Sequence, residues 1–214
     1  METLLQSTPL NFTSPIPMET LHLHIRQDMK LQIKQSLLKR RKLMGKSEVL
    51  EKSAVIQESL FNLEEYKKAK TVMFYVSFDN EVFTHDMILN SLKRKYVVVP
   101  KLVQDGIEPS LIIDFDNMIS VGKFGILEPI ELLKVPYSRI DLVLVPGIAF
   151  DKNGHRVGYG LGHYDKFLKK VPKAAKIGLC FEFQIIDSIP SKEHDVPLDT
   201  IVTEQRVMQI KSQN

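Results

Sequence analysis

Cysteine is almost absent, since Cys180 is the single one among 214 residues and no disulfide can form within the chain. A lone thiol is typical of a reducing compartment, and the apolar residues 177–181 around it favour a packed core thiol over a nucleophile. Long apolar runs are also missing, because none approaches the roughly 20 residues that a helix needs to cross a bilayer. The sequence therefore predicts a cytoplasmic protein without a membrane partner.

The first part of the chain lacks basic residues, since residues 1–25 contain neither lysine nor arginine. A secretory signal begins with basic residues and a transit peptide is rich in arginine, so neither is indicated. The letters METL at residues 1–4 recur at residues 18–21, so a flexible extension and a misplaced start both stay open. We expect residues 1–25 to be an extension and residues 26–214 to form one domain, because a chain with 43% hydrophobic residues can bury a core unaided.

Positive charge is concentrated near the N-terminus, although the formal net charge is only +3. The run from Lys39 to Lys42 is of a kind that nucleic-acid-binding proteins and localisation signals use. No aromatic residues or recognition motif accompany the run. We interpret it as the solvated face of a helix with some role toward anionic ligands, and nucleic acid is not expected as a partner.

Hydrophobic spacing predicts alternating helices and strands. An amphipathic helix is expected over residues 28–44 with Gly45 ending it, and a second helix from an N-cap at Ser47 to residue 62. Thr84 is the expected N-cap of a third helix. Short apolar runs predict strands at residues 72–76, 96–99 (ended by Pro100), 110–115, 142–145, 176–181 and 200–203, with a further helix at residues 164–170.

Buried strands separated by helices predict the fold class. We expect a single three-layer α/β/α domain with a mostly parallel, Rossmann-like sheet, because parallel neighbours need crossover helices. Ligands of such sheets bind outside the carboxyl ends of the strands. The clearest strand, residues 142–145, leads into a glycine-rich stretch, and the candidate site is expected there.

Glycine occupies every second position from 158 to 162. Glycines let backbone amides approach a phosphate closely, and the start of a following helix adds partial positive charge. The stretch is neither a Walker loop nor the usual dinucleotide fingerprint, so a purely structural glycine loop stays open. Asp165 directly after it, and Asp195 further on, suit a magnesium nucleotide, which needs only one or two protein carboxylates; a helix cap is the alternative for Asp165.

Residues 145–165 read VPGIAFDKNGHRVGYGLGHYD. Together with four further blocks in the same order, at residues 30–41, 81–84, 125–129 and 195–199, they resemble the 5-formyltetrahydrofolate cyclo-ligases, also called methenyltetrahydrofolate synthetases. The likeness covers residues 30–204. It implies an α/β enzyme, expected as a monomer, that uses ATP and magnesium on 5-formyltetrahydrofolate, with or without a polyglutamate tail, in one-carbon metabolism.

The implied reaction yields 5,10-methenyltetrahydrofolate, ADP and phosphate. The formyl group on N5 is an amide with a poor leaving oxygen, so attack by N10 stalls until that oxygen carries a phosphoryl group. No protein nucleophile is required, and the protein supplies positioning and charge neutralisation.

The resemblance also implies a set of site residues. ATP contacts fall on two lysines and the glycine-rich stretch, namely Lys30, Lys34, Arg156, Val157, Gly158, Tyr159, Gly160, Leu161, Gly162, His163 and Tyr164. Folate contacts fall on Val76, Glu81, Tyr159, His163 and Tyr164, and magnesium on Asp165 and Asp195. The structural alternatives are solvated lysines, a turn residue at Glu81, and an Arg156–Asp151 pair in a solvent-facing loop.

The chain departs from the family pattern at a few positions. Family members often carry arginine in place of Lys34, a basic residue or glycine in place of Tyr159 and Leu161, and an aromatic residue in place of His163. Lysine keeps the charge of arginine but loses its bidentate fork. Two other functions therefore stay open: a paralogue that binds folate or nucleotide with little turnover, and a basic adaptor whose binding to nucleic acid would be sensitive to salt.

Overall fold

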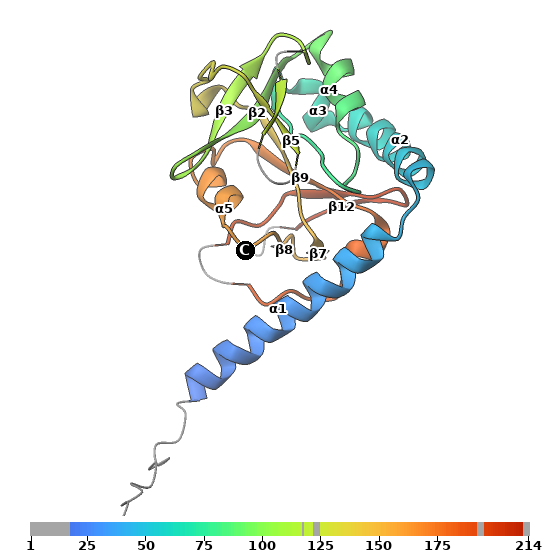
Figure 1. The fold of residues 1–214 in the computed structure, drawn as a ribbon, viewed down its shortest axis with the longest axis vertical. Helices are drawn as coiled ribbons and strands as arrows, with labels where there is room; N and C mark the ends of the chain where they lie inside the picture. Colours follow the sequence, from blue (N-terminus) through green and yellow to red (C-terminus); the bar gives the residue numbers. More distant parts are fainter. Residues whose placement is uncertain (1–17, 117, 122–124, 192–194, 212–214) are drawn as a thin grey trace, which may run out of the picture.

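A seven-stranded sheet crosses the centre of the molecule in this computed structural model (Figure 1). The structure describes residues 18–116, 118–121, 125–191 and 195–211. Across the sheet the strands are β12 (Val207–Gln209), β11 (Thr200–Val202), β9 (Ala175–Leu179), β6 (Leu142–Val145), β1 (Thr71–Met73), β2 (Tyr96–Val103) and β3 (Gly106–Ile112). The strands from β11 to β2 are parallel to their neighbours, and the edge strands β12 and β3 are antiparallel to theirs.

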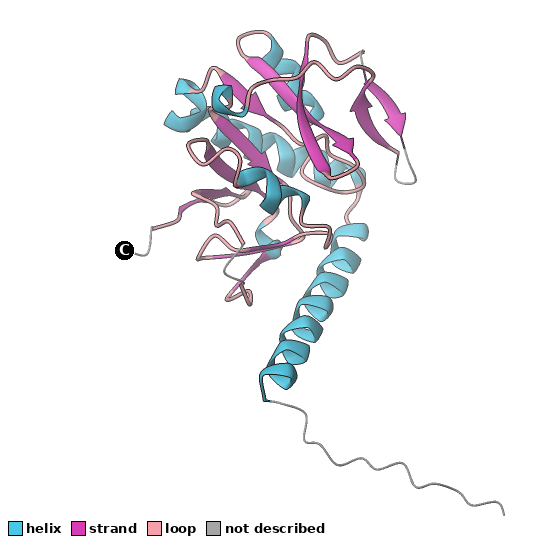
Figure 2. Cartoon of the chain, turned by 90° about the vertical axis from the view of Figure 1, so that its left-hand side faces the viewer, coloured by secondary structure: helices cyan, strands magenta, loops and turns pink. Residues whose placement is uncertain are grey.

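Helices lie on both faces of this sheet (Figure 2). They are α1 (Met18–Lys42), α2 (Lys46–Asn62), α3 (Glu64–Lys68), α4 (His85–Leu92) and α5 (His163–Leu168), with short 3-10 turns η1 (Tyr137–Arg139) and η2 (Glu182–Gln184). Val72 and Leu144 pack in one core with α2, α3 and α4, whereas Val143 and Val145 pack in another with Phe167 of α5. Since alternate strand residues point to opposite faces, the expected three-layer α/β fold with a mostly parallel sheet is confirmed.

Two smaller sheets complete the structure. One joins β7 (Ala149–Asp151), β8 (Arg156–Val157) and β10 (Ile185–Ile186), and the other is the hairpin of β4 (Met118–Val121) and β5 (Ile126–Pro129). Helix α1 projects from the body, and its C-terminal part crosses the first small sheet (Figure 1). Ile33 and Leu37 of α1 pack there against a small core of Ala149, Val157 and Ile189, and this packing brings the basic face of α1 to the candidate site.

The N-terminal segment differs in part from the sequence interpretation. Helix α1 begins at Met18 rather than at residue 28, so residues 18–25 are helical, while residues 1–17 lie outside the described part of the chain. The division into an extension and one domain stays a prediction. No helix among the described residues is long and apolar enough to cross a membrane.

Strand β6 has the expected bounds, whereas β2 does not end at Pro100. The pairing of β2 with β1 stops at Val98, and beyond it β2 continues to Val103 by pairing with β3. Proline has no N–H to donate to a neighbouring strand. Beyond Val98, β1 no longer pairs with that edge of β2, so a proline there costs no hydrogen bond to β1. In the same register Pro100 lies opposite Pro109.

Of the two expected helix caps, Ser47 is wrong and Thr84 is confirmed in position, although its side chain does not cap the helix. Gly45 precedes α2 as its N-cap, and the Ser47 hydroxyl instead donates to Glu51 at 2.8 Å. Thr84 is the N-cap residue of α4, but its hydroxyl donates to the Tyr75 carbonyl at 2.7 Å and accepts from the Ser77 N–H at 3.0 Å. Thr84 thus holds the loop after β1 rather than the start of α4.

Candidate active site

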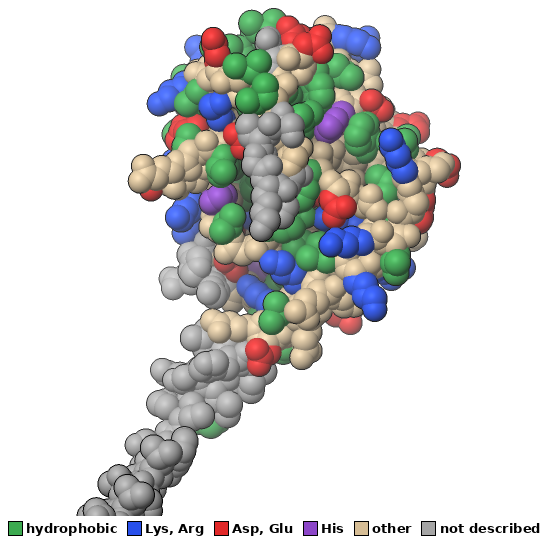
Figure 3. Space-filling view, in the orientation of Figure 1, with side chains coloured by type: hydrophobic (Ala, Val, Ile, Leu, Met, Phe, Trp, Pro, Cys, Tyr) green, Lys and Arg blue, Asp and Glu red, His purple; other side chains and the backbone are tan. Residues whose placement is uncertain are grey.

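The candidate site lies beyond the carboxyl end of β6. The chain leaves Val145, forms the hairpin of β7 and β8, and continues through residues 158–162 into α5. The loop after β1, with Glu81, reaches the same place, because the Tyr159 hydroxyl lies 3.4 Å from the Glu81 carboxylate. Lysine and arginine side chains gather where α1 meets the body of the molecule (Figure 3). The structure therefore brings together the glycine-rich segment, the loop after β1 and the basic face of α1.

The glycines of residues 158–162 are not packed against the rest of the protein. Gly160 has φ 107° and Gly162 has φ 66°, which are backbone conformations that favour glycine. A Cβ added at 158, 160 or 162 would meet open space. Gly154 is different, because a Cβ there would lie 2.7 Å from the Leu198 carbonyl oxygen. Packing thus accounts for Gly154, and the loop at 158–162 keeps its backbone open to a ligand.

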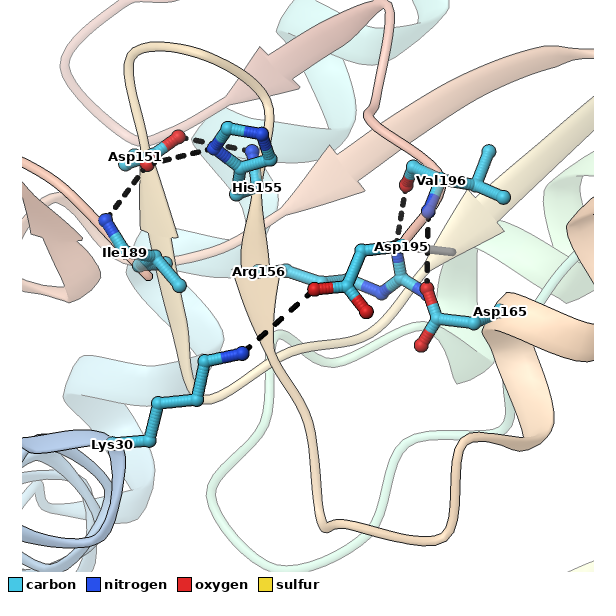
Figure 4. Close-up of polar contacts among 8 residues, drawn as sticks. All are labelled: Lys30, Asp151, His155, Arg156, Asp165, Ile189, Asp195 and Val196. Atoms are coloured by element: carbon cyan, nitrogen blue, oxygen red, sulfur yellow. Dashed lines mark hydrogen bonds and ion pairs between the residues drawn. The ribbon is translucent and has the colours of Figure 1, made fainter. Parts of the chain in front are cut away.

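The Arg156 side chain is largely enclosed and makes two hydrogen bonds to the protein (Figure 4). Its Nη2 donates to Oδ1 of Asp165 at 2.8 Å, and its Nη1 donates to the Val196 carbonyl at 3.0 Å. The Val196 N–H donates to the same Asp165 oxygen at 3.3 Å. We call Arg156, Asp165 and Val196 the Arg156 centre. With 5% of its side chain exposed, Arg156 does not face solvent as the sequence suggested, because β8 turns the residue inward beneath the C-terminal segment.

Two structural alternatives at this centre are wrong. Asp151 does not pair with Arg156, because its carboxylate faces His155 at 3.1 Å and accepts from the Ile189 N–H at 2.9 Å (Figure 4). Asp165 is no helix cap: Gly162 holds the N-cap position of α5, and Oδ1 of Asp165 accepts from Arg156 and Val196 instead.

The two lysines predicted to hold ATP both reach the site. Lys30 Nζ lies 3.8 Å from Asp195 Oδ2 (Figure 4). Lys34 Nζ donates to the Tyr159 carbonyl at 2.8 Å, and it lies 5.8 Å from the centre of the Tyr159 ring. Both contacts are consistent with a position next to the glycine-rich loop.

A second cluster, which we call the Arg41 centre, consists of Arg41, Glu81 and Tyr159. Arg41 Nη2 donates to the Tyr159 hydroxyl at 2.6 Å, and Nη1 lies 3.8 Å from Oε1 of Glu81. Sequence reasoning missed Arg41 as a site residue, because it was assigned to the solvated basic face. It is only 2% exposed. The signal was present, since Arg41 follows Ile33 and Leu37 at intervals of four on the packed face of α1.

Burial controls the ionisation of the Arg41 centre. Burial raises the pKa of Glu81 to about 7, and the neighbouring Arg41 charge and the Phe78 N–H partly oppose the rise. Burial also raises the pKa of Tyr159 to about 12. Tyr164 is close by, its pKa is raised by burial, and its hydroxyl has no hydrogen-bond partner among the described residues. Glu81 therefore titrates near neutral pH while the tyrosines stay protonated.

The other predicted site residues lie at different depths. Val76 and Val157 are buried, His163 is the first residue of α5 and half-buried, and Leu161 is 70% exposed. Val76 belongs to the same buried core as Val82. The structure thus places Leu161 at the surface and Val76 in the core.

The carboxylates proposed for magnesium are compatible with a shared nucleotide site. Asp165 accepts from the Arg156 guanidinium, and Asp195 directly precedes Val196, whose carbonyl accepts from the same guanidinium (Figure 4). The described residues contain no group of three acidic, histidine or cysteine side chains that would hold a metal ion by themselves. Magnesium keeps several waters and needs one or two carboxylates beside phosphate oxygens, so the residues present fit this ion only together with a nucleotide.

Comparisons with known proteins agree on one family. A model described as the 5-formyltetrahydrofolate cyclo-ligase family matches residues 26–204. The chain is 33% identical over 156 residues to the 5-formyltetrahydrofolate cyclo-ligase of Haemophilus influenzae. The aligned region covers 70% of this chain and 83% of that protein. The chain is 31% identical over 146 residues to the Escherichia coli K12 enzyme of the same name, covering 65% and 80%.

Two solved structures resemble this chain in fold. The 5,10-methenyltetrahydrofolate synthetase of Aquifex aeolicus superposes with a TM-score of 0.78 at 32% identity, covering 87% of this chain and 95% of that one. The Mycoplasma pneumoniae 5,10-methenyltetrahydrofolate synthetase has a TM-score of 0.67 at 26% identity, with coverage of 82% and 98%.

Proposed function

This chain belongs to the 5-formyltetrahydrofolate cyclo-ligase family, and on that premise we propose that it converts 5-formyltetrahydrofolate and ATP into 5,10-methenyltetrahydrofolate, ADP and phosphate. One observation carries the proposal. An open glycine loop with cations beside it meets a buried carboxylate, Glu81, that titrates near neutral pH. The loop suits a nucleotide, and the carboxylate suits a ligand with hydrogen-bond donors.

On the nucleotide side, the backbone amides of residues 158–162 would hold the phosphates, and Lys30 and Lys34 would supply positive charge. Lys34 already reaches this loop through the Tyr159 carbonyl. Arg156 holds the start of α5 through its bond to Asp165, and its charge would add to the positive potential at the phosphates. Phosphoryl transfer depends mainly on such positioning and charge neutralisation.

On the folate side, Glu81 would accept hydrogen bonds from the pterin amino group and ring N–H. Its Oε2 accepts from the Phe78 N–H at 3.3 Å, which leaves Oε1 facing Tyr159 and Arg41. Tyr159 and His163, on the loop between the two substrates, would contact the formyl end. Folate and phosphate would then meet over residues 158–163.

The reaction requires no covalent bond to the protein. The formyl oxygen takes the γ-phosphoryl group as the bond to ADP breaks, N10 then adds to the activated carbon, and phosphate leaves as N10 loses its proton. Each residue named above binds, orients or neutralises charge. Magnesium, when bound, would supply further neutralisation of the phosphate oxygens, and Asp165 and Asp195 would hold it.

The competing functions have less support. Arg41 of the basic run is buried in the site, so the run is not an exposed patch for nucleic acid as a whole. A paralogue that binds folate or nucleotide with little turnover would use the same residues, and the turnover assay below separates it from the enzyme.

The test is a turnover assay. Purified protein mixed with 5-formyltetrahydrofolate, ATP and magnesium should form methenyl product, followed by its near-ultraviolet absorbance, and omission of ATP should abolish it. The Lys152→Ala variant, which removes an exposed charge on the β7–β8 hairpin, is the matched control and should behave as the wild type. Product formation at an equal rate without ATP, or none with folded protein, would reject the proposal.

A further inference from the structure

The guanidinium of Arg41 is buried without enough hydrogen-bond partners. Its Nε has none among the described residues, and Nη1 stands 3.8 Å from Glu81, beyond hydrogen-bond distance. The short bond from Nη2 to the Tyr159 hydroxyl is the one hydrogen bond that the guanidinium makes within the described chain. Buried charged donors are costly to leave unsatisfied, so this arrangement points to a ligand that completes them.

The position of Arg41 is fixed by the surrounding structure. The Asn80 side-chain amide donates to the carbonyls of Arg41 at 3.0 Å and of Met44 at 2.9 Å. Asn80 is the neighbour of Glu81 in the chain, so the end of α1 and the loop with the carboxylate are tied together. The guanidinium and the carboxylate are thus held side by side. They line one small hollow together with Tyr75, Val82, Pro146 and Gly147.

A carboxylate beside a guanidinium presents acceptors next to donors. The edge of a 2-amino-4-oxopteridine presents the complementary order, with an amino N–H and a ring N–H followed by an oxo oxygen. We propose that Arg41 is a substrate-contacting residue that donates to this oxo oxygen while Glu81 accepts from the two N–H groups. The inference rests on the proposed function, and it adds the residue that selects an oxo group over an amino group at that position.

Tyr159 holds the place of the substrate in the free protein. Its hydroxyl accepts from Arg41 and donates to Glu81, so it offers both groups the same polarity that the pterin edge would offer. The side chain is 40% exposed, and Gly158 and Gly160 beside it have open space around them. Binding of the pterin would therefore replace the Tyr159 hydroxyl as the partner of Arg41 and Glu81.

The experiment measures binding without ATP, by calorimetry on the full chain. The ligands are 5-formyltetrahydrofolate and its analogue with an amino group in place of the 4-oxo group. The wild type should prefer the oxo compound by roughly 10- to 100-fold, as expected for a hydrogen bond to a charged group. Arg41→Met should lower the affinity for the oxo compound and shrink the ratio severalfold. The remaining preference comes from Glu81, because the amino analogue also lacks the ring N–H from which this carboxylate accepts. Lys42→Met, at an exposed neighbour on α1, should keep the ratio.

A second variant covers the case in which Arg41→Met folds poorly. Tyr159→Phe removes the competing hydroxyl, so it should bind the oxo compound about threefold or more tightly than the wild type, because the free state loses the hydrogen bonds of this hydroxyl to Arg41 and Glu81. The inference would be overturned, but not the proposed function, by either of two results. One is weaker binding of the oxo compound by Tyr159→Phe, and the other is an unchanged ratio of the two affinities in folded Arg41→Met. A wild type that binds neither compound would overturn the proposed function with it.

Discussion

The arginines of the Arg156 centre and the Arg41 centre differ in how many hydrogen bonds the protein offers to their guanidinium groups. Arg156 donates from both Nη atoms, to Asp165 and to the Val196 carbonyl, so the protein itself supplies an anionic and a neutral acceptor. Arg41 has one hydrogen bond, to a tyrosine on a loop of glycines, and an orphaned Nε among the described residues. This difference is the basis of our proposal that Arg41 binds a ligand, whereas Arg156 serves the fold and the local charge.

The largest expected effect on stability is that of replacing Arg156. Arg156→Ala leaves Asp165 without its cation and Val196 without a donor, so the free energy of unfolding should fall by about 2–3 kcal/mol, less than for a fully enclosed pair. The reduction for exposure applies because the Asp165 side chain is 29% exposed. Urea unfolding of the ligand-free protein measures the change. Turnover should fall as well, because the positive charge that Arg156 would add at the phosphates is lost.

Lys152→Ala is again the control and should unfold as the wild type does. An Arg156→Ala variant with unchanged unfolding but weak ATP binding would mean that Arg156 acts only on the nucleotide. The contrast between the two arginines would then be lost.

The second prediction sharpens the comparison through pH. Glu81 must be ionised to accept from the pterin, so kcat/KM for the folate should fall as the pH drops through about 7, the raised pKa of this carboxyl. Arg41 and the Tyr159 hydroxyl lower this pKa, whereas burial and Asp79 raise it. Arg41→Met should therefore move the inflection to higher pH, by about one unit if the pair is worth about 1.4 kcal/mol.

Stability gives an independent measure of the same group. Because the pKa of Glu81 is raised in the folded state, its contribution to stability is present below its ordinary pKa of 4.5 and is lost as the pH rises through about 7. The wild type should thus lose stability relative to Glu81→Gln over that interval. An inflection of kcat/KM that stays in place in Arg41→Met would show that the two groups are uncoupled.

The sequence predicted the parts of these centres that depend on neighbouring residues, but not the contacts between residues far apart in the chain. Strand β6 and the glycine-rich segment were found because apolar runs and glycine spacing are local patterns. The partner of Arg156 was wrong, since the sequence spacing to Asp151 and Asp165 does not reveal which carboxylate the turn brings near. Arg41 was hidden in a run of basic residues, and only the packing of Ile33 and Leu37 shows which of them points inward. Pro100 stayed in β2 because β1 had already ended, which is a property of the sheet and not of the strand.

The smallest effect on stability is expected at Gly158, in the loop that joins the two centres. Its backbone is one that alanine adopts, and the added Cβ would meet open space, so the free energy of unfolding of Gly158→Ala should change by less than about 0.5 kcal/mol. The methyl group would nevertheless stand where a phosphate approaches the backbone amides. We expect KM for ATP to rise about three- to tenfold, the value of one hydrogen bond, while KM for the folate changes little. Steady-state kinetics with each substrate varied in turn gives both constants.

Gly154→Ala is the matched control, because its Cβ would lie 2.7 Å from the Leu198 carbonyl oxygen at φ 82°. That variant should lose stability by roughly 1–3 kcal/mol through strain, with KM for ATP unchanged in the folded fraction. If Gly158→Ala instead raises KM for the folate and leaves that for ATP unaltered, the loop amides face the Arg41 centre, and the nucleotide is held by the lysines of α1.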